Sequence, residues 1–116
     1  MTEMTIFMLV RATPAWLALT PTERFAFVGE TIRPALAERP ELALRYFDAE
    51  AFSARVSDVM MWRVADMAQW LSLVEDLRET RFWGDYFEVL DIIPAVEDAY
   101  ATHYGVDRVG ASTPAG

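Results

Sequence analysis

The stretch Leu42 to Arg63, LALRYFDAEAFSARVSDVMMWR, decides the fold, because it holds two strand-like segments with no helix between them. Residues 42–48 and 56–63 are rich in apolar and aromatic side chains, which are typical of β-strands. Their connection is longer than a tight hairpin turn but too short for the helical crossover that parallel strands need. We therefore predict that the two segments pair as antiparallel neighbours.

Two apolar runs outside this stretch predict two further strands. Residues Thr5–Arg11, TIFMLVR, are almost continuously apolar, as expected for a strand buried on both faces. Residues Phe87–Ile93, FEVLDII, are the second run. One helical pattern lies before residues 42–63 and a second lies after them. The resulting order, β-α-β-β-α-β, is the ferredoxin-like pattern of an α+β protein with a four-stranded antiparallel sheet.

Capping signals mark where the two helices begin. Thr20 and Glu23 form a capping-box pattern at the start of the first helix, which ends near Arg39. Pro34 lies inside this helical pattern and should kink or loosen the helix. Asp66 is the predicted N-cap of the second helix, whose apolar side chains recur at helical spacing.

A further short helix is predicted after the last strand. Pro94 is expected to open it and Gly105 to end it. Residues 106–116 are small and polar without periodicity, so we expect a flexible tail. Residues 1–105 are then a single ferredoxin-like domain, in keeping with a chain of 116 residues.

Large apolar side chains on both faces of the predicted sheet point to a homodimer. Along residues 42–48, Leu44 and Tyr46 share one face, and Arg45 and Phe47 share the other. The two helices can cover only one face, and the second would be an unusually large exposed apolar patch. We therefore predict that two copies pack their sheets together into a dimeric α+β barrel.

Composition excludes several classes of function. The chain has no cysteine and no lysine, which excludes thiol chemistry, disulfides and lysine-bound cofactors. The net charge of −8 argues against nucleic-acid binding. No apolar run is long enough to cross a membrane and no secretory signal opens the chain, so we expect a cytoplasmic protein without membrane contact.

The chain resembles the darcynin family of small bacterial proteins in four stretches. These are TIFMLV at Thr5–Val10, RYFDAE at Arg45–Glu50, RVSDVMMW at Arg55–Trp62 and the long VEDLRETRFWGDYFEVLDIIPAVEDAYATHY at Val74–Tyr104. The family is similar to dimeric α+β-barrel proteins, which include cofactor-free monooxygenases of polyketide pathways. The resemblance implies the fold and the dimer, and it assigns no catalytic residue.

Asp58 is the first candidate for a catalytic group, because burial of a mid-strand carboxylate raises its pKa toward a useful range. Arg45, on the neighbouring strand, could instead pair with Asp58 and fix the strand register or a dimer contact. Tyr46 shares a face with Asp48 and could orient a phenolic substrate, or simply end a strand in water. His103 could act as a base. Alternatively, it could only be a protonated side chain that interacts favourably with the helix dipole at the C-terminal end beside Gly105.

A group of aromatic side chains, together with a methionine, could line a binding site for a flat apolar ligand. The same side chains could instead belong to the hydrophobic core. We predict that Arg45 anchors an anionic or carbonyl oxygen of the ligand within this group. The predicted binding residues are Arg45, Phe47, Met60, Trp62, Trp83 and Tyr86.

The sequence shows no cofactor or metal signature. Its acidic pairs lack the loop of alternating ligands that calcium needs, and there is no glycine-rich phosphate loop. We therefore expect no metal and no cofactor. We predict a cofactor-independent enzyme that acts on a small aromatic or polyketide-like metabolite in a bacterial biosynthetic pathway. The alternative is a non-catalytic small-molecule-binding or accessory protein on the same scaffold.

Overall fold

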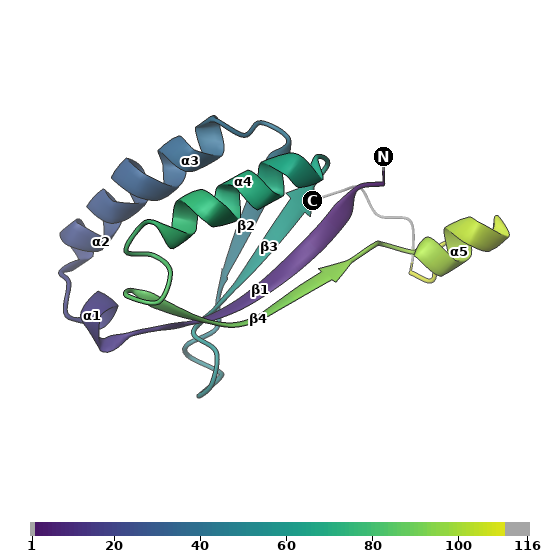
Figure 1. The fold of residues 1–116 in the computed structure, drawn as a ribbon. Helices are drawn as coiled ribbons and strands as arrows, with labels where there is room; N and C mark the ends of the chain where they lie inside the picture. The colour runs from purple at the N-terminus through teal and green to yellow at the C-terminus, as the bar shows by residue number, and fades with distance from the viewer. Residues whose placement is uncertain (1, 111–116) are drawn as a thin grey trace.

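Four antiparallel strands form the sheet of the computed structural model, which describes residues 2–110. The strands β1 (Met4–Ala12) and β3 (Asp58–Val64) lie at the centre, and β2 (Leu42–Asp48) and β4 (Phe87–Ala95) form the edges. The order β2-β3-β1-β4, with every pairing antiparallel, confirms the predicted ferredoxin-like α+β fold (Figure 1).

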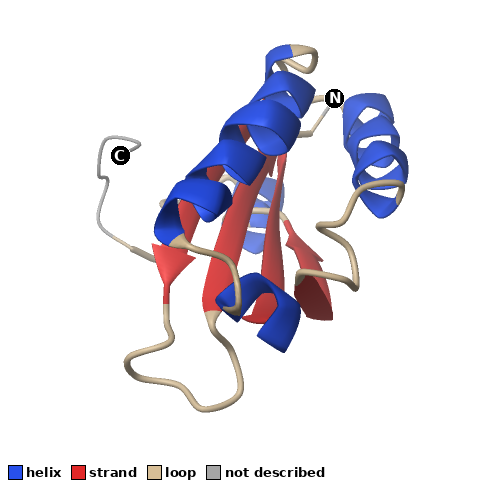
Figure 2. Cartoon of the chain, turned by 90° about the vertical axis from the view of Figure 1, so that its left-hand side faces the viewer, coloured by secondary structure: helices blue, strands red, loops and turns tan. Residues whose placement is uncertain are grey.

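The helices α1 to α4 lie over one face of the sheet (Figures 1 and 2). The first predicted helix is one continuous segment with a π-helical turn, η1, in its middle, and the second is α4. The bounds are α1 (Pro14–Leu17), α2 (Pro21–Phe27), η1 (Val28–Ile32), α3 (Arg33–Ala37), α4 (Met67–Arg78) and α5 (Ala99–Tyr104).

The predicted caps are present at both long helices. The side chain of Thr20 accepts a hydrogen bond from the Glu23 amide at 3.2 Å, and the Glu23 carboxylate accepts one from the Thr20 amide at 2.8 Å. The Asp66 carboxylate accepts a hydrogen bond from the Ala68 amide at 2.9 Å. These bonds satisfy amides that have no partner inside the helix.

The irregularity expected at Pro34 takes the form of the π-helical turn η1. Proline has no amide hydrogen, and its ring crowds the carbonyl of the preceding turn. One wider turn before Pro34 relieves this conflict, and the Arg33 amide hydrogen bonds to the Val28 carbonyl. The helix continues through α3 instead of ending.

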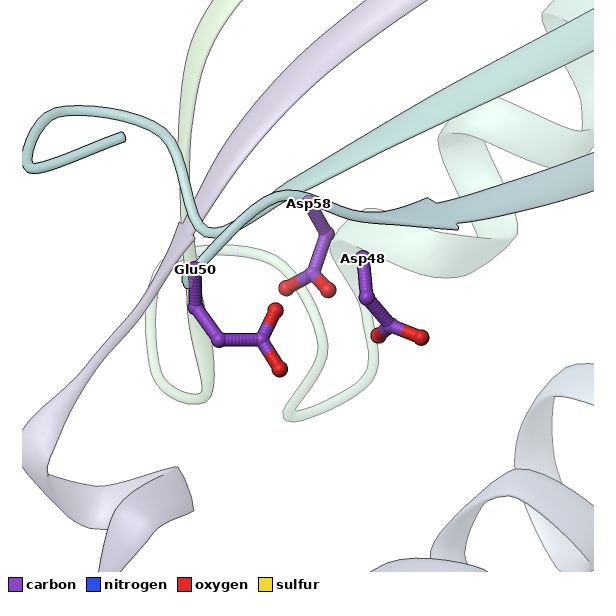
Figure 3. Close-up of side chains that lie close together, drawn as sticks. All are labelled: Asp48, Glu50 and Asp58. Carbon is purple, nitrogen blue, oxygen red and sulfur yellow. The ribbon is translucent and has the colours of Figure 1, made fainter. Parts of the chain in front are cut away.

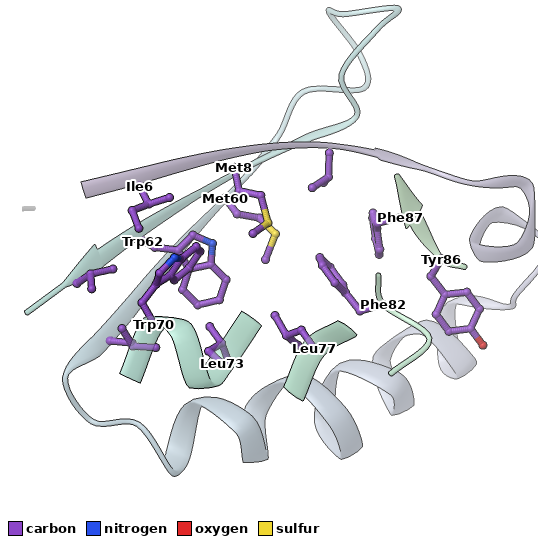
Figure 4. Packing of buried hydrophobic residues seen from close by; sticks show 13 residues of the cluster. Ile6, Met8, Met60, Trp62, Trp70, Leu73, Leu77, Phe82, Tyr86 and Phe87 are labelled. Carbon is purple, nitrogen blue, oxygen red and sulfur yellow. The ribbon is translucent and has the colours of Figure 1, made fainter. Parts of the chain in front are cut away.

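The core lies between the helices and the inner face of the sheet, meaning the face that α1 to α4 cover (Figure 4). Alternate residues of β1 and β3 point into it, as the period of a strand requires. Trp62 is fully buried and packs edge-on against Trp70 of α4, with ring centroids 5.5 Å apart. The buried core residues of the central strands are Ile6, Met8, Val10, Met60, Trp62 and Val64.

Arg39 is a buried charge that the sequence analysis did not single out. Its guanidinium donates hydrogen bonds to the Ala35 carbonyl at 2.9 Å and to the Ser72 hydroxyl at 2.9 Å, and it also pairs with Asp76. Its side chain is only 7% exposed. Arg39 therefore fastens the end of α3 to α4.

The C-terminal region differs from the prediction. Pro94 does not open a helix but lies in β4 opposite Ile6, and α5 begins at Ala99, after Asp98 in a left-handed conformation with φ of 49°. Gly105, with φ of 66°, ends the helix as predicted. Pro94 is tolerated in β4 because β4 is an edge strand, where a missing amide hydrogen breaks no pairing.

The tail prediction concerns residues 106–116, of which 111–116 lie outside the described residues. In the described part, the Val106 amide hydrogen bonds to the Ala101 carbonyl at 3.0 Å, and the Val109 amide to the Asp98 carboxylate at 3.3 Å. These two bonds connect Val106 and Val109 to the α5 segment, although residues 106–110 are exposed, and the flexibility of the tail stays a prediction.

The outer face of the sheet, meaning the face opposite the core, is not covered by a helix of residues 2–110 (Figure 1). Its side chains form rows across the strands, because the register pairs Arg45 with Met61, Met61 with Phe7, and Phe7 with Ile93. Phe47 and Ile93 are 42% and 44% exposed. The described chain therefore carries the second apolar face that the sequence predicted.

Candidate functional site

A cleft of about 640 Å³ opens between the helical segment α2-η1-α3 and the inner face of the sheet near β2 and β3. Most of its wall is aromatic or aliphatic, including side chains of the core. The apolar lining residues include Trp16, Leu17, Phe25, Phe27, Val28, Ile32, Leu36, Leu44, Met60, Phe82 and Phe87.

Three carboxylates lie at the end of this cleft (Figure 3). Asp48 ends β2, Glu50 follows it, and Asp58 begins β3. The antiparallel register places Asp48 opposite Asp58, so carboxylates ten residues apart in the sequence come together at the open end of the strand pair. One oxygen from each of Asp48, Glu50 and Asp58 lies within 4.8 Å of the others.

Asp58 is the most buried of the three, with 7% exposure. Burial raises its pKa from the ordinary value of 3.8 to about 6, although hydrogen bonds from the Ser57 and Tyr46 hydroxyls oppose the rise, and the nearby Glu50 carboxylate adds to it. Ser57 donates to Asp58 Oδ2 at 2.7 Å and itself accepts the Ala12 amide at 2.7 Å. Asp58 therefore gains and loses its proton close to neutral pH.

Tyr46 stands beside Asp58 on the same face and also lines the cleft. Partial burial, followed by the negative charge of Asp58, raises the pKa of the Tyr46 hydroxyl well above its ordinary value of 10. The phenol stays protonated at every physiological pH. The cleft thus offers a hydrogen-bond donor, Tyr46, next to a proton acceptor, Asp58.

Of the predicted site residues, the structure brings Asp58, Tyr46 and Met60 together in the cleft. Arg45 is not among them, and the register excludes the alternative in which it pairs with Asp58. Arg45 lies opposite Met61 on the outer face, and the residue opposite Asp58 is Asp48. Arg45 instead lies over the ring of Phe47, 5.2 Å from its centroid, on that same outer face.

The other predicted residues lie outside the cleft lining. Trp62 is buried in the core. Tyr86 is also buried, and it packs edge-on against Phe27 of the cleft wall at a centroid distance of 4.9 Å. Trp83 is half-buried beside Phe82. His103 is exposed on α5, which Figure 1 shows beyond the end of β4.

Sequence reasoning noted Asp48 only as a neighbour of Tyr46 and missed Glu50. The signal was present in the pattern Asp48-Ala49-Glu50, which follows one strand of the pair, while Asp58 begins the other. Residues at the two ends of a short connection between antiparallel strands must lie close together. The helical wall gave no such signal, because its apolar side chains look the same whether they fill a core or line a cleft.

The three carboxylates could hold a divalent cation only with additional water ligands, since magnesium and calcium take six or more oxygen ligands. The expectation of no metal stays a prediction. Within residues 2–110, no helix has the length and apolar character needed to span a bilayer.

Comparison with solved structures first defines the class. The chain is similar to two variants of chlorite dismutase from Candidatus Nitrospira defluvii, with TM-scores of 0.70 and 0.68 at 11% and 12% identity. The matches cover 90% and 89% of this chain but only 44% and 43% of those chains, so it spans less than half of their length. This likeness shows a shared ferredoxin-like α+β fold.

Sequence comparison then gives the family. Residues 1–114 match the family described as "Darcynin, domain of unknown function". A darcynin homolog of Granulibacter bethesdensis is 44% identical over 93% of this chain and 88% of the relative, and one of Streptomyces avermitilis is 43% identical over 94% and 91%. The chain belongs to the darcynin family, as the resemblance implied.

Proposed function

We propose that this protein is a cofactor-independent enzyme that binds a small aromatic or polyketide-like molecule in the cleft and removes a proton from it. The observation that carries the proposal is the position of Asp58, a buried carboxylate with a pKa of about 6 at the end of a largely apolar cleft. A general base works best when its pKa lies near the working pH. The aromatic wall supplies the surface on which a flat molecule can bind.

In the proposed reaction, ionised Asp58 takes a proton from a carbon atom next to a carbonyl group of the bound molecule. The electron pair of the broken bond stays on the substrate, where an adjacent carbonyl becomes an enolate. Tyr46 remains protonated; once Asp58 has taken the proton, the Tyr46 hydroxyl turns from Asp58 and donates its hydrogen bond to the developing oxyanion. Proton and charge therefore balance between Asp58 and the substrate.

Proton exchange on a simple ketone tests this proposal without a known substrate. 2-Tetralone, a bicyclic aromatic ketone, is incubated with the protein in D₂O, and loss of its C1 protons is followed by NMR. We expect exchange to fall by about two to four orders of magnitude in Asp58→Asn. The exposed Asp107→Asn is the matched control and should retain the wild-type rate.

The second candidate is a non-catalytic small-molecule-binding or accessory protein. It is favoured by the absence of any histidine, lysine or cysteine from the cleft lining in the described chain. In the same experiment, 2-tetralone that perturbs cleft resonances without accelerated exchange would reject the enzyme and support the binding protein. No perturbation at all would reject both functions.

We further propose that two copies pair through the outer face of the sheet. This face is apolar at its centre, and its two edge strands carry opposite charges that have no ion pair within the described chain, Arg45 on β2 and Asp91 on β4. Asp91 lies on this face because it is opposite Leu9, which points away from the core. A two-fold axis that places β2 over β4 of the partner brings these charges close together.

A further inference from the structure

We propose that the ligand of the cleft is an organic cation, an amine carried on an apolar, ring-sized body. The inference rests on the proposed function, because it assigns a charge to the molecule that the cleft binds. It reverses the ligand expected from the sequence, which was to be anchored by Arg45 through an anionic or carbonyl oxygen.

The first step is the charge at the end of the cleft. Asp48, Glu50 and Asp58 converge there (Figure 3), and no arginine or histidine of residues 2–110 forms an ion pair with any of them. Asp58 is more than nine-tenths buried and lines the cleft. Carboxylates grouped in this way repel one another, and a cation bound among them removes the repulsion and replaces lost hydration.

The second step concerns the positive groups of the cleft. Arg24 and Arg33 line it from the helical wall. The Arg24 guanidinium is occupied by the backbone, since it donates to the Trp16 carbonyl at 3.2 Å and to the Leu17 carbonyl at 3.1 Å. Arg33 is exposed at the start of α3 and forms no ion pair with a described residue. The buried charge of the cleft is therefore negative, and its free positive charge lies at the solvent side.

The third step is the shape of the ligand. The volume of about 640 Å³ exceeds what a metal ion or a simple ammonium ion would fill. Aromatic side chains, among them Trp16, Phe27 and Phe87, line the same cleft as the carboxylates. A bicyclic hydrocarbon with one protonated amine matches both the apolar wall and the acidic end.

Three probes that share one bicyclic body test this assignment. These are 2-aminotetralin, a cation, the neutral 2-tetralol, and the anionic tetralin-2-carboxylate, titrated at pH 7.5 and 150 mM salt by NMR. We expect the amine to bind at least about tenfold tighter than either of the others, which corresponds to about 1.4 kcal/mol. Affinity for the amine should weaken as the pH falls from 7.5 to 5, because Asp58 gains its proton in this range.

A matched pair of variants separates the cleft from the general negative charge of the protein. Asp48→Asn with Glu50→Gln should lower the preference for the amine, because buried Asp58 still supplies one negative charge, and adding Asp58→Asn should abolish it. Glu75→Gln with Glu79→Gln makes the same change of net charge as Asp48→Asn with Glu50→Gln. It does so at an exposed position of α4 and at the exposed residue that follows the helix, and it should keep the preference.

Each other outcome overturns the inference in a distinguishable way. Equal binding of the three probes, or tighter binding of the carboxylate, would reject a cationic ligand and leave the proposed cleft function standing. A preference for the amine that survives the removal of all three charges would place the cation elsewhere and reject this site. No binding of any probe would reject the cleft function together with the inference.

Discussion

Folding raises the pKa of Asp58 from 3.8 to about 6. The ionised form of Asp58 is therefore less stable in the folded protein than in the unfolded chain. The folded state therefore holds the proton more tightly, and the contribution of Asp58 to stability is present below pH 4. It is lost as the pH rises from about 4 to 6, by about 2–3 kcal/mol at most.

Asp58→Asn should therefore stabilise the protein above pH 6. Asparagine has a similar shape and carries no charge, so the gain should reach about 2–3 kcal/mol at pH 7.5 and vanish near pH 4. Urea denaturation of both proteins at the two pH values measures the difference. Asp107→Asn, at an exposed position, provides the control. A destabilised Asp58→Asn at pH 7.5 would contradict the assigned burial.

Arg39 is a second residue whose environment predicts a measurable effect. Arg39→Ala removes hydrogen bonds to the Ala35 carbonyl and the Ser72 hydroxyl together with the pairing to Asp76. We expect a loss of about 2–3 kcal/mol in the free energy of unfolding. Arg78→Ala, at an exposed position of α4, should change it by less than about 1 kcal/mol. Chemical denaturation provides both values, and equal losses would show that Arg39 does not fasten α3 to α4.

The segment α2-η1-α3 carries one wall of the cleft, so its start should influence both stability and binding. Thr20→Ala removes the side-chain cap of α2 and should lower the free energy of unfolding by about 1 kcal/mol. Thr22→Ala, inside the helix and exposed, is the matched control and should have little effect. Thermal unfolding followed by circular dichroism distinguishes the two, and indistinguishable curves would contradict the capping box.

Among the elements, the sequence predicted those that depend on local patterns. The strand Leu42–Asp48 and the caps at Thr20 and Asp66 match the structure. The π-helical turn before Pro34 and the extension of β4 through Pro94 could not be predicted. The first depends on how the helix backbone adjusts locally to a residue without an amide hydrogen. The second depends on the position of β4 at the edge of the sheet, where that hydrogen is not needed.

The candidate site was predictable only in part, for a reason that lies in strand geometry. Asp58 stood out because the sequence predicted it in the middle of an apolar strand. It instead begins β3, and it lines the cleft. Arg45 was assigned to the same site, but side chains alternate between the faces of a strand, so the register decides whether two residues meet. The register places Asp48 opposite Asp58 and leaves Arg45 on the outer face.

For the whole molecule, the charged edges of the outer face give a direct test of the proposed dimer. Arg45→Asp alone, and Asp91→Arg alone, should each weaken association by about tenfold or more, because like charges then face each other. The double variant should recover most of the affinity. Sedimentation at micromolar concentration measures each step. A wild-type monomer, or a double variant as weak as the single ones, would reject this pairing.

The cleft wall and the core share Met60, Phe82 and Phe87. A molecule bound in the cleft therefore contacts side chains that also hold the helices on the sheet, and it binds only the folded chain. At one hundred times its dissociation constant, such a ligand adds about 2.7 kcal/mol to the free energy of unfolding. Where proteases remove transiently unfolded chains, the abundance of this protein should therefore rise with the supply of its ligand.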